Sequence, residues 1–324
     1  MKKNIISIII IGLLMFITFQ LLTSSNIIFE TVSFSFEIWK TSIFPSIFPF
    51  FVISEILINY GFIELVAEIF KPLMNKLFKT KGTSAYVFIM GMVSGFPSSA
   101  KYVNELYVQG LIDEKEGTKI LLFTHFSNPL FVLGTISILF LNSQKVGFLI
   151  LLCHYISNFI LGLIFRNYYP SKNENTKFSF KNSINFMTKH RINNHKNFGQ
   201  ILSDSVINSV NTLLIILGTI TVFLILTTII NKCITLNPVM QAILNGFFEM
   251  TQGLKYISLT NISLKLKSII STMFISFGGI SVHMQIISIL SNTKIKYFPF
   301  LISRILHAII SGILVFFLFD FYIL

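Results

Sequence analysis

The sequence predicts an all-α polytopic membrane protein that forms a single integral membrane domain over residues 1–324. Hydrophobic residues make up 53% of the chain and charged residues only 12%, against a charged share of about 25% in ordinary soluble domains. So few charges cannot provide the polar surface that a water-soluble fold of this size needs. Lipid must therefore cover much of the protein.

Six apolar runs are long enough to cross the bilayer as helices, which takes about 17–25 residues. They are nearly free of charge and cover residues 5–22, 120–141, 147–165, 206–230, 269–290 and 298–319. Two lysines precede the first run, but no small-residue cleavage site follows it. We therefore interpret the first run as a retained anchor.

Three further apolar stretches carry helix breakers. Residues 42–62 contain two prolines and Glu55, and residues 238–256 contain two glycines and Glu249. Irregular backbone and carboxylates at membrane depth are tolerated only inside protein or along a wet cavity, so we expect two re-entrant hairpins. Residues 84–107 break at the sequence SGFPSS, which predicts a discontinuous helix.

The two halves of the chain show the same order of irregular features. In residues 38–165 and again in 201–324, a Glu-bearing stretch precedes a Gly-containing break, and an apolar span follows. The segment between them, residues 166–200, holds seven basic residues and one acidic residue, which predicts a cytoplasmic loop. Two such repeats indicate a secondary transporter with its substrate site between them.

The helix restarts after the breaks are candidate anion sites. The first N–H groups of a restarted helix are unpaired and carry partial positive charge. Ser98, Ser99 and Ser281 stand at these restarts. Lys101 and His283 follow within about one turn and could add charge-assisted hydrogen bonds. These five residues are predicted to bind substrate.

Further candidate residues carry charge or polarity into apolar segments. Glu55 and Glu249 join the predicted substrate site, because an ionisable residue at membrane depth is functional by default. Asn128 lies in FTHFSNPL, a polar interruption of an apolar span that indicates a polar lining. Arg304 and His307, one turn apart in the last span, are expected to balance the charge of Glu249 or of the substrate.

Plainer explanations exist for some of these features. Gly and Pro are frequent in membrane helices, so either break alone could be a packing kink. Lys101 could reach the interface or pair with Glu105, four residues further on. The repetition of the order in both halves favours a transport site.

Several functional classes find no support in the sequence. No phosphate-binding loop, dinucleotide fingerprint, zinc-protease motif or serine-nucleophile pattern is present, so we predict no enzyme and no catalytic residues. The two cysteines lie far apart without ligand spacing, and no metal site is expected. The formal net charge of +12 resides mainly in loops between apolar runs, so a nucleic-acid partner is not expected.

Five long stretches carry a resemblance to a known family. They are SGFPSSAK (94–101), FTHFSNPLF (123–131), GFFEMTQGL (246–254), FGGISVHMQIISIL (277–290) and PFLISRILHA (299–308). With them, nearly the whole chain is similar to the sporulation integral membrane proteins of the YlbJ type from endospore-forming Firmicutes, which belong with the nucleoside-recognition, or Gate, domains. The second half also resembles the late membrane region of concentrative nucleoside transporters.

The resemblance implies a multi-pass protein of the bacterial cell membrane that acts during sporulation in the mother-cell or outer forespore membrane. The implied cargo is dipicolinic acid, a small aromatic dicarboxylate. Beside this dianion, at least one of Glu55 and Glu249 must be protonated, cation-bound or paired with Arg304. No resident cofactor is expected, although a coupling cation or proton fits this arrangement. The expected partners are the lipid bilayer and either a second copy or other sporulation membrane proteins.

Two other functions stay open. A nucleoside or nucleobase carrier of the Gate class would use aromatic and amide groups, which Phe123, Asn128 and Gln252 could supply. A non-transporting membrane scaffold for sporulation partners would tolerate replacement of the intramembrane Glu and Ser residues.

Overall fold

The computed structural model describes residues 2–171 and 180–323, and within them every regular element is a helix. Five helical segments in these ranges are long and apolar enough to cross a membrane: Ser25–Asn59, Gln144–Asn167, Phe198–Cys233, Leu264–Leu290 and Tyr297–Ile323. Four of them coincide with predicted spans. The all-α polytopic class is therefore confirmed.

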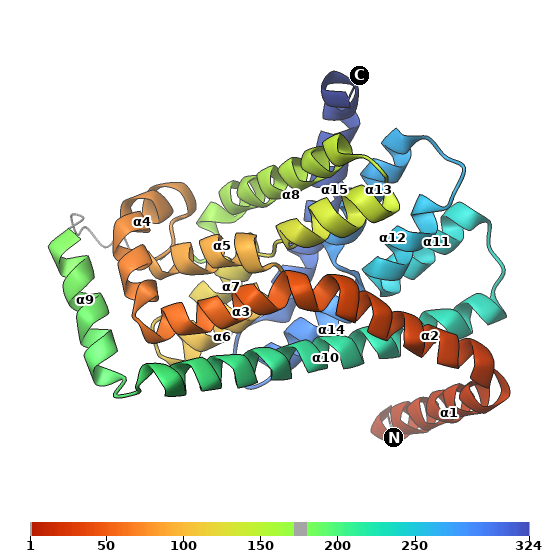
Figure 1. Ribbon diagram of the computed structural model, residues 1–324, viewed down its shortest axis with the longest axis horizontal. Coiled ribbons are helices and arrows are strands. Elements are labelled where there is room, and N and C mark those ends of the chain that lie inside the picture. Colours follow the sequence, from red (N-terminus) through yellow and green to blue (C-terminus); the bar gives the residue numbers. More distant parts are fainter. Residues whose placement is uncertain (1, 172–179, 324) are drawn as a thin grey trace.

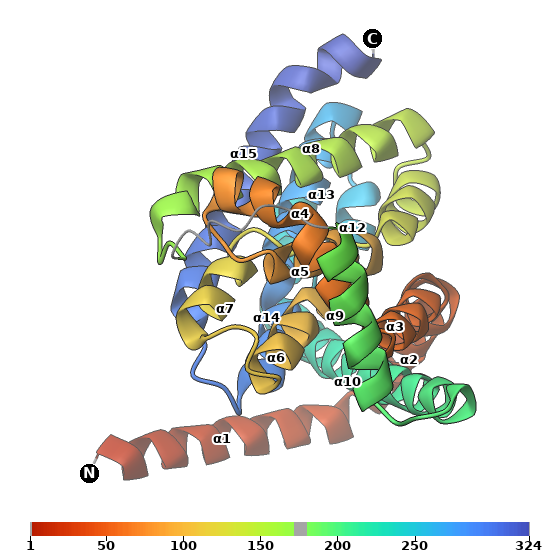
Figure 2. The ribbon, with the colours of Figure 1, turned by 90° about the vertical axis from the view of Figure 1, so that its left-hand side faces the viewer.

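Helix α1 (Lys2–Thr23) stands off from the bundle. Its axis crosses that of α10 (Phe198–Cys233) at a large angle, as Figures 1 and 2 together show. Its apolar side chains stay exposed, among them Ile8 at 68% and Leu22 at 75%. The predicted first span is thus an apolar helix with little protein around it.

The re-entrant hairpin predicted over residues 42–62 is wrong. Helix α2 (Ser25–Ile38), the π-helical segment η1 (Trp39–Ile43) and helix α3 (Phe44–Asn59) form one continuous run of 35 residues. The Phe44 N–H bonds to the Trp39 carbonyl, five residues back, just before Pro45. Local π adjustments of this kind re-satisfy the backbone groups that prolines leave free in membrane helices.

Helix α10 runs antiparallel along this long helix (Figure 1). Trp39 Nε1 donates to the Leu213 carbonyl at 3.0 Å, and the hydroxyls of Thr31 and Thr228 are 3.0 Å apart. Ile47, Phe51, Ile216 and other buried side chains fill the contact between the two helices.

The rest of the first half contains shorter helices. They are α4 (Phe62–Phe78), α5 (Thr83–Ser94), α6 (Ser98–Val108), α7 (Glu114–Leu121), the π-helical η2 (Phe131–Phe140) and α8 (Gln144–Ile164), which ends in a short η3 turn (Phe165–Asn167). The predicted discontinuous helix is present as α5 and α6.

The continuous span predicted over residues 120–141 is wrong. Helix α7 ends at Leu121 and η2 begins only at Phe131, with non-helical backbone over residues 124–128. Polar side chains from within this segment and from neighbouring helices bond the interrupted backbone, as described below. The apolar composition of the run conceals the interruption.

Helix α9 (Phe180–Asn193) precedes the second half and occupies part of the loop predicted over residues 166–200. Residues 172–179 of that loop lie outside the described residues. After α10, helices α11 (Pro238–Phe248) and α12 (Met250–Ser258) form a helical hairpin that turns at Glu249. Helices α13 (Leu264–Phe277) and α14 (Gly279–Leu290) follow, separated at Gly278, and α15 (Tyr297–Ile323) completes the chain.

The turns and breaks pack against one another in pairs. A Cβ atom at Gly95, in the turn between α5 and α6, would lie 2.5 Å from the Asn128 nitrogen in the break before η2. A Cβ atom at Gly279, at the α13–α14 break, would lie 3.1 Å from the Met250 nitrogen at the hairpin turn. Each half thus places one turn against one break near the centre of the bundle.

The α11–α12 hairpin depends on close contact between two glycines. A Cβ atom at Gly253 would lie 2.2 Å from Gly246 Cα, which is backbone and cannot rotate away. We expect Gly253→Ala to lower the free energy of unfolding by about 1–3 kcal/mol, the usual cost of overpacking. Unfolding in detergent micelles measures this.

Gly218→Ala on α10 is the matched control, because a Cβ atom there meets nothing within 4 Å. Its stability should stay within about 1 kcal/mol of wild type. Equal stability of the two variants would contradict the close hairpin packing.

Candidate functional site

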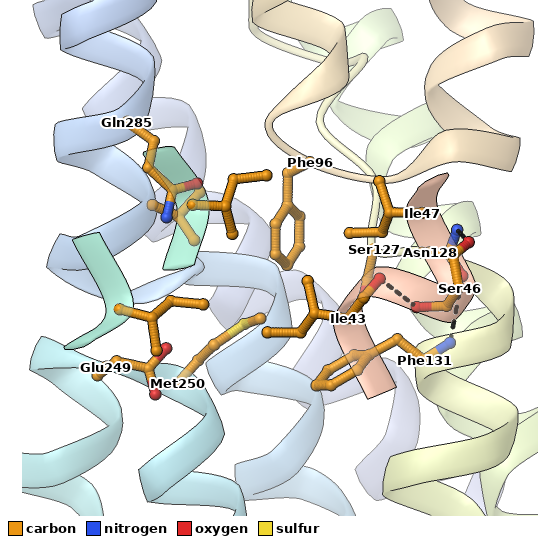
Figure 3. Close-up of a pocket in the computed structure, with 13 residues that line it drawn as sticks. Ile43, Ser46, Ile47, Phe96, Ser127, Asn128, Phe131, Glu249, Met250 and Gln285 are labelled. Carbon is orange, nitrogen blue, oxygen red and sulfur yellow. Dashed lines mark hydrogen bonds between the residues drawn. The ribbon is translucent and has the colours of Figure 1, made fainter. Parts of the chain in front are cut away.

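A pocket opens where the turns and breaks of the two halves meet (Figure 3). Its cavity volume is about 40 Å³, room for a few water molecules and well below the roughly 300–1,000 Å³ of typical small-molecule sites, so the space is narrow in this conformation. The lining comes from η1, α3, the α5–α6 turn, the break before η2, η2 itself, α10, the α11–α12 turn, α12 and α14. It comprises Ile43, Ser46, Ile47, Phe96, Ser127, Asn128, Phe131, Ile216, Ile220, Glu249, Met250, Val282 and Gln285.

Glu249 places a carboxylate in this pocket. It lies between α11 and α12 and is 1% exposed. Its Oε2 accepts hydrogen bonds from the Gln252 N–H at 3.0 Å and from the Thr251 hydroxyl. The buried Ser281 side chain lies beside it. The carboxylate therefore caps α12 and faces the pocket at once.

Asn128 lines the pocket, but its amide serves the backbone. Nδ2 donates to the carbonyls of Ser46, Val93 and Ser94 at 3.0–3.2 Å. Oδ1 accepts from the N–H groups of Leu130 and Phe131 at 2.8 and 3.2 Å. Because its donors and its acceptor are engaged in this way, the amide holds the backbone at the break and has little hydrogen-bonding capacity left for a solute.

Other polar groups of the pocket are less engaged. The Ser127 hydroxyl is buried and makes no hydrogen bond within the part of the chain that the structure describes. Gln285 is 4% exposed and brings a further amide from α14. Figure 3 shows the Phe96 ring between Gln285 on one side and Ser127 on the other, with Phe131 on the side of Asn128. The pocket thus offers a carboxylate, a hydroxyl, an amide and two aromatic rings.

Sequence reasoning missed some of these residues. Gln285 and Phe96 lie next to the predicted restarts but carry neither the charge nor the hydroxyl group that indicates an anion site, and Ser46 lies in the Pro-rich run predicted to be a hairpin. Ser127 belongs to the segment predicted as a polar lining, and it does line the pocket.

Other predicted site residues lie outside the pocket lining. Ser98 and Ser99 donate to the carbonyls of Gly95 and Thr124, so their hydroxyls hold the α5–α6 turn in place. Glu55 and Lys101 form an ion pair with each other. His283 bonds the Phe277 carbonyl through Nε2 at 3.1 Å and the Tyr297 hydroxyl through Nδ1 at 2.8 Å.

Arg304 bonds the interrupted backbone before η2. It is 0% exposed and donates to the carbonyls of Leu122 at 2.6 Å and His125 at 3.2 Å. It also contacts Asn158 Oδ1 at 3.3 Å and His307 Nδ1 at 2.8 Å. Among the described residues its hydrogen-bond partners do not include Glu249, and the expected balance of the charge of Glu249 or of the substrate stays a prediction.

Four short helices begin around the pocket: α6, η2, α12 and α14. Asn128 accepts from the first N–H groups of η2, and Glu249 caps α12. Helices α6 and α14 start without a side-chain cap. The positive ends of these helix dipoles offset the charge of Glu249, although no Lys, Arg or His lines the pocket itself.

Removal of the Arg304 guanidinium should destabilise the protein strongly. Arg304→Met leaves two buried carbonyls and the Asn158 oxygen without this donor. Because such hydrogen bonds involve a charged group, we expect a loss of about 3–5 kcal/mol in the free energy of unfolding. Lys40→Met is the control, since Lys40 is 76% exposed; equal stability of both variants would contradict the assigned role.

Comparison with known proteins agrees with this architecture. A family model described as nucleoside recognition, the Gate family, matches residues 41–144. The chain is 30% identical to the sporulation integral membrane protein YlbJ of Bacillus subtilis (strain 168), in an alignment that covers 97% of this chain and 83% of that protein. No solved structure matches. The chain belongs to the YlbJ family of sporulation integral membrane proteins.

Proposed function

We propose that this membrane protein is a carrier that moves a small solute during sporulation, with dipicolinic acid as the first candidate. The observation that carries the proposal is the convergence of two turns and two helix breaks on one narrow cavity of about 40 Å³, lined by Glu249, Ser127 and Gln285, which must widen to admit a solute. Secondary transporters bind substrate at such interrupted helices, near the membrane midplane and between repeats.

Internal spacing supports two repeats around this pocket. Gly95, in the α5–α6 turn, and Gly246, near the end of α11, are each followed by Phe and are 151 residues apart, and so are Phe126 and Phe277 at the two breaks. In this alignment α5–α6 corresponds to α11–α12, and α7–η2 corresponds to α13–α14. The predicted pairing of the Glu55 and Glu249 stretches is replaced, because Glu55 lies in a continuous helix. Rocking of one repeat against the other would expose the pocket alternately to the two sides.

Membership of a sporulation family and the convergent helix starts favour dipicolinate. The start of α14 has no side-chain cap and presents partial positive charge toward a carboxylate. Glu249 opposes a dianion when it is ionised, so on this proposal it carries a proton or a cation while the solute is bound. The mother-cell or outer forespore membrane is the corresponding place of action.

A nucleoside is the second candidate, because the pocket also holds groups suited to a neutral solute. Phe96 and Phe131 offer ring faces for stacking, and Gln285 and Glu249 offer hydrogen-bonding groups for a base or sugar. The match of residues 41–144 to the nucleoside recognition family supports this candidate.

Uptake into proteoliposomes distinguishes the two candidates, because one substitution should affect the uptake of dipicolinate and of uridine differently. Glu249→Gln removes a negative charge from the pocket and keeps its shape. Dipicolinate uptake should be retained or rise, since repulsion is relieved. Uridine uptake should fall by about tenfold or more, because a hydrogen bond to a charged group contributes about 1.5–3 kcal/mol.

Glu37→Gln is the control, because the Glu37 side chain is 63% exposed on α2; its uptake should equal that of wild type. Absence of uptake of both solutes by the folded wild-type protein would contradict the carrier proposal and favour a membrane scaffold.

A further inference from the structure

A buried group of charges lies outside the pocket, where α3 and α6 approach each other. Glu55 of α3 and Lys101 of α6 form an ion pair with side chains only 10% and 15% exposed. Lys101 Nζ also lies 5.3 Å from the centre of the Phe51 ring. Glu105, one turn after Lys101 on α6, adds a second carboxylate near both.

This second carboxylate is incompletely paired. Glu105 Oε2 is enclosed and has no hydrogen-bond partner among the described residues. The hydroxyl of Tyr86, a side chain that is 0% exposed, likewise has none there, although it lies near Glu55, Glu105 and Tyr102. The Glu105 carboxyl group therefore keeps one enclosed oxygen that no described donor satisfies.

The charges do not balance when all three side chains are ionised. Two carboxylates and one ammonium leave one net negative charge in a buried place, which burial and carboxylate repulsion both disfavour. Helix α5 carries no charged residue. On other packed helices, Glu116 of α7 pairs with Lys81 at 3.3 Å, Asp204 of α10 pairs with Lys196 at 2.8 Å, and His283 of α14 bonds Tyr297. Tyr102 bonds Ser54 and Ser94 at 2.8 and 2.9 Å and brings no charge.

The group is connected to the pocket through α6. Lys101 lies three residues, or about 4.5 Å along the helix axis, beyond the start of α6 at Ser98, and Phe96 in the preceding turn lines the pocket. Tyr102 bonds the Ser94 hydroxyl, and the Ser94 carbonyl accepts a hydrogen bond from Asn128 in the pocket wall. A change of charge here therefore acts on the turn that closes the pocket.

We infer that Glu55, Lys101 and Glu105 form a proton-binding site that couples proton movement to solute transport. Glu105 takes one proton from one aqueous side, which leaves a neutral set made of the Glu55–Lys101 pair and the Glu105 carboxylic acid. Release of that proton on the other side restores one negative charge. This inference rests on the carrier function proposed above, and the site is separate from the substrate pocket.

Proton binding is testable without any solute. In pH-difference infrared spectra of the reconstituted protein, wild type should show a carboxylic acid band that disappears on alkalinisation. Glu105→Gln should lack this band. Glu55→Gln should lack it too, because the remaining carboxylate then pairs with Lys101. Glu37→Gln should keep it, and an identical band in all four proteins would overturn the assignment.

Transport measurements distinguish the coupling of proton movement to transport from the movement of the solute itself. A pH gradient should drive solute accumulation in wild-type proteoliposomes but not in Glu105→Gln, while exchange of labelled for unlabelled solute continues in both. Gradient-driven accumulation by Glu105→Gln at the wild-type level would overturn the coupling role. Loss of all flux in wild type would instead contradict the carrier proposal, and the infrared result would still decide whether the proton site exists.

Discussion

Backbone that leaves the helix inside a membrane must find its hydrogen-bond partners within the protein, and this constraint organises the centre of the molecule. Arg304 supplies donors to the carbonyls of Leu122 and His125. The Asn158 amide adds a second donor to His125 at 2.7 Å, and His154 Nε2 accepts from the Ser127 N–H at 2.9 Å. These buried side chains hold open a non-helical segment that lipid could not stabilise.

The same constraint sorts the polar residues of the centre into two groups. Asn128, Ser98 and Ser99 donate hydrogen bonds to backbone carbonyls of the turns and breaks. These side chains therefore stabilise the fold rather than bind a solute. Ser127 and Gln285 are left facing the pocket, and Glu249 does both, since it caps α12 and lines the cavity. The chemistry available to a solute is therefore narrower than the number of buried polar residues suggests.

Features that depend on local composition can be predicted from the sequence. Features that depend on contacts between residues far apart in the sequence cannot. Long apolar runs reveal four spans, and Gly-containing turns reveal the interruptions at residues 95–97 and 278. The stretch 42–62 misleads because a π-helical turn absorbs Pro45 without reversing the chain. The role of Arg304 is hidden because its acceptors lie 146 to 182 residues away in sequence. Glu55 and Lys101 are both recognisable as important, but only the fold shows that they pair with each other.

The central claim is that solute binds in the pocket between the two halves, and site-directed labelling tests it most directly. In a background with Cys153 and Cys233 replaced, a water-soluble thiol reagent would be applied to Gln285→Cys, in the pocket, and to Ser291→Cys, exposed at the end of α14. The transported solute should slow labelling of Gln285→Cys and leave labelling of Ser291→Cys unchanged. Labelling of Gln285→Cys at the same rate with and without a solute that the protein carries would contradict the central claim.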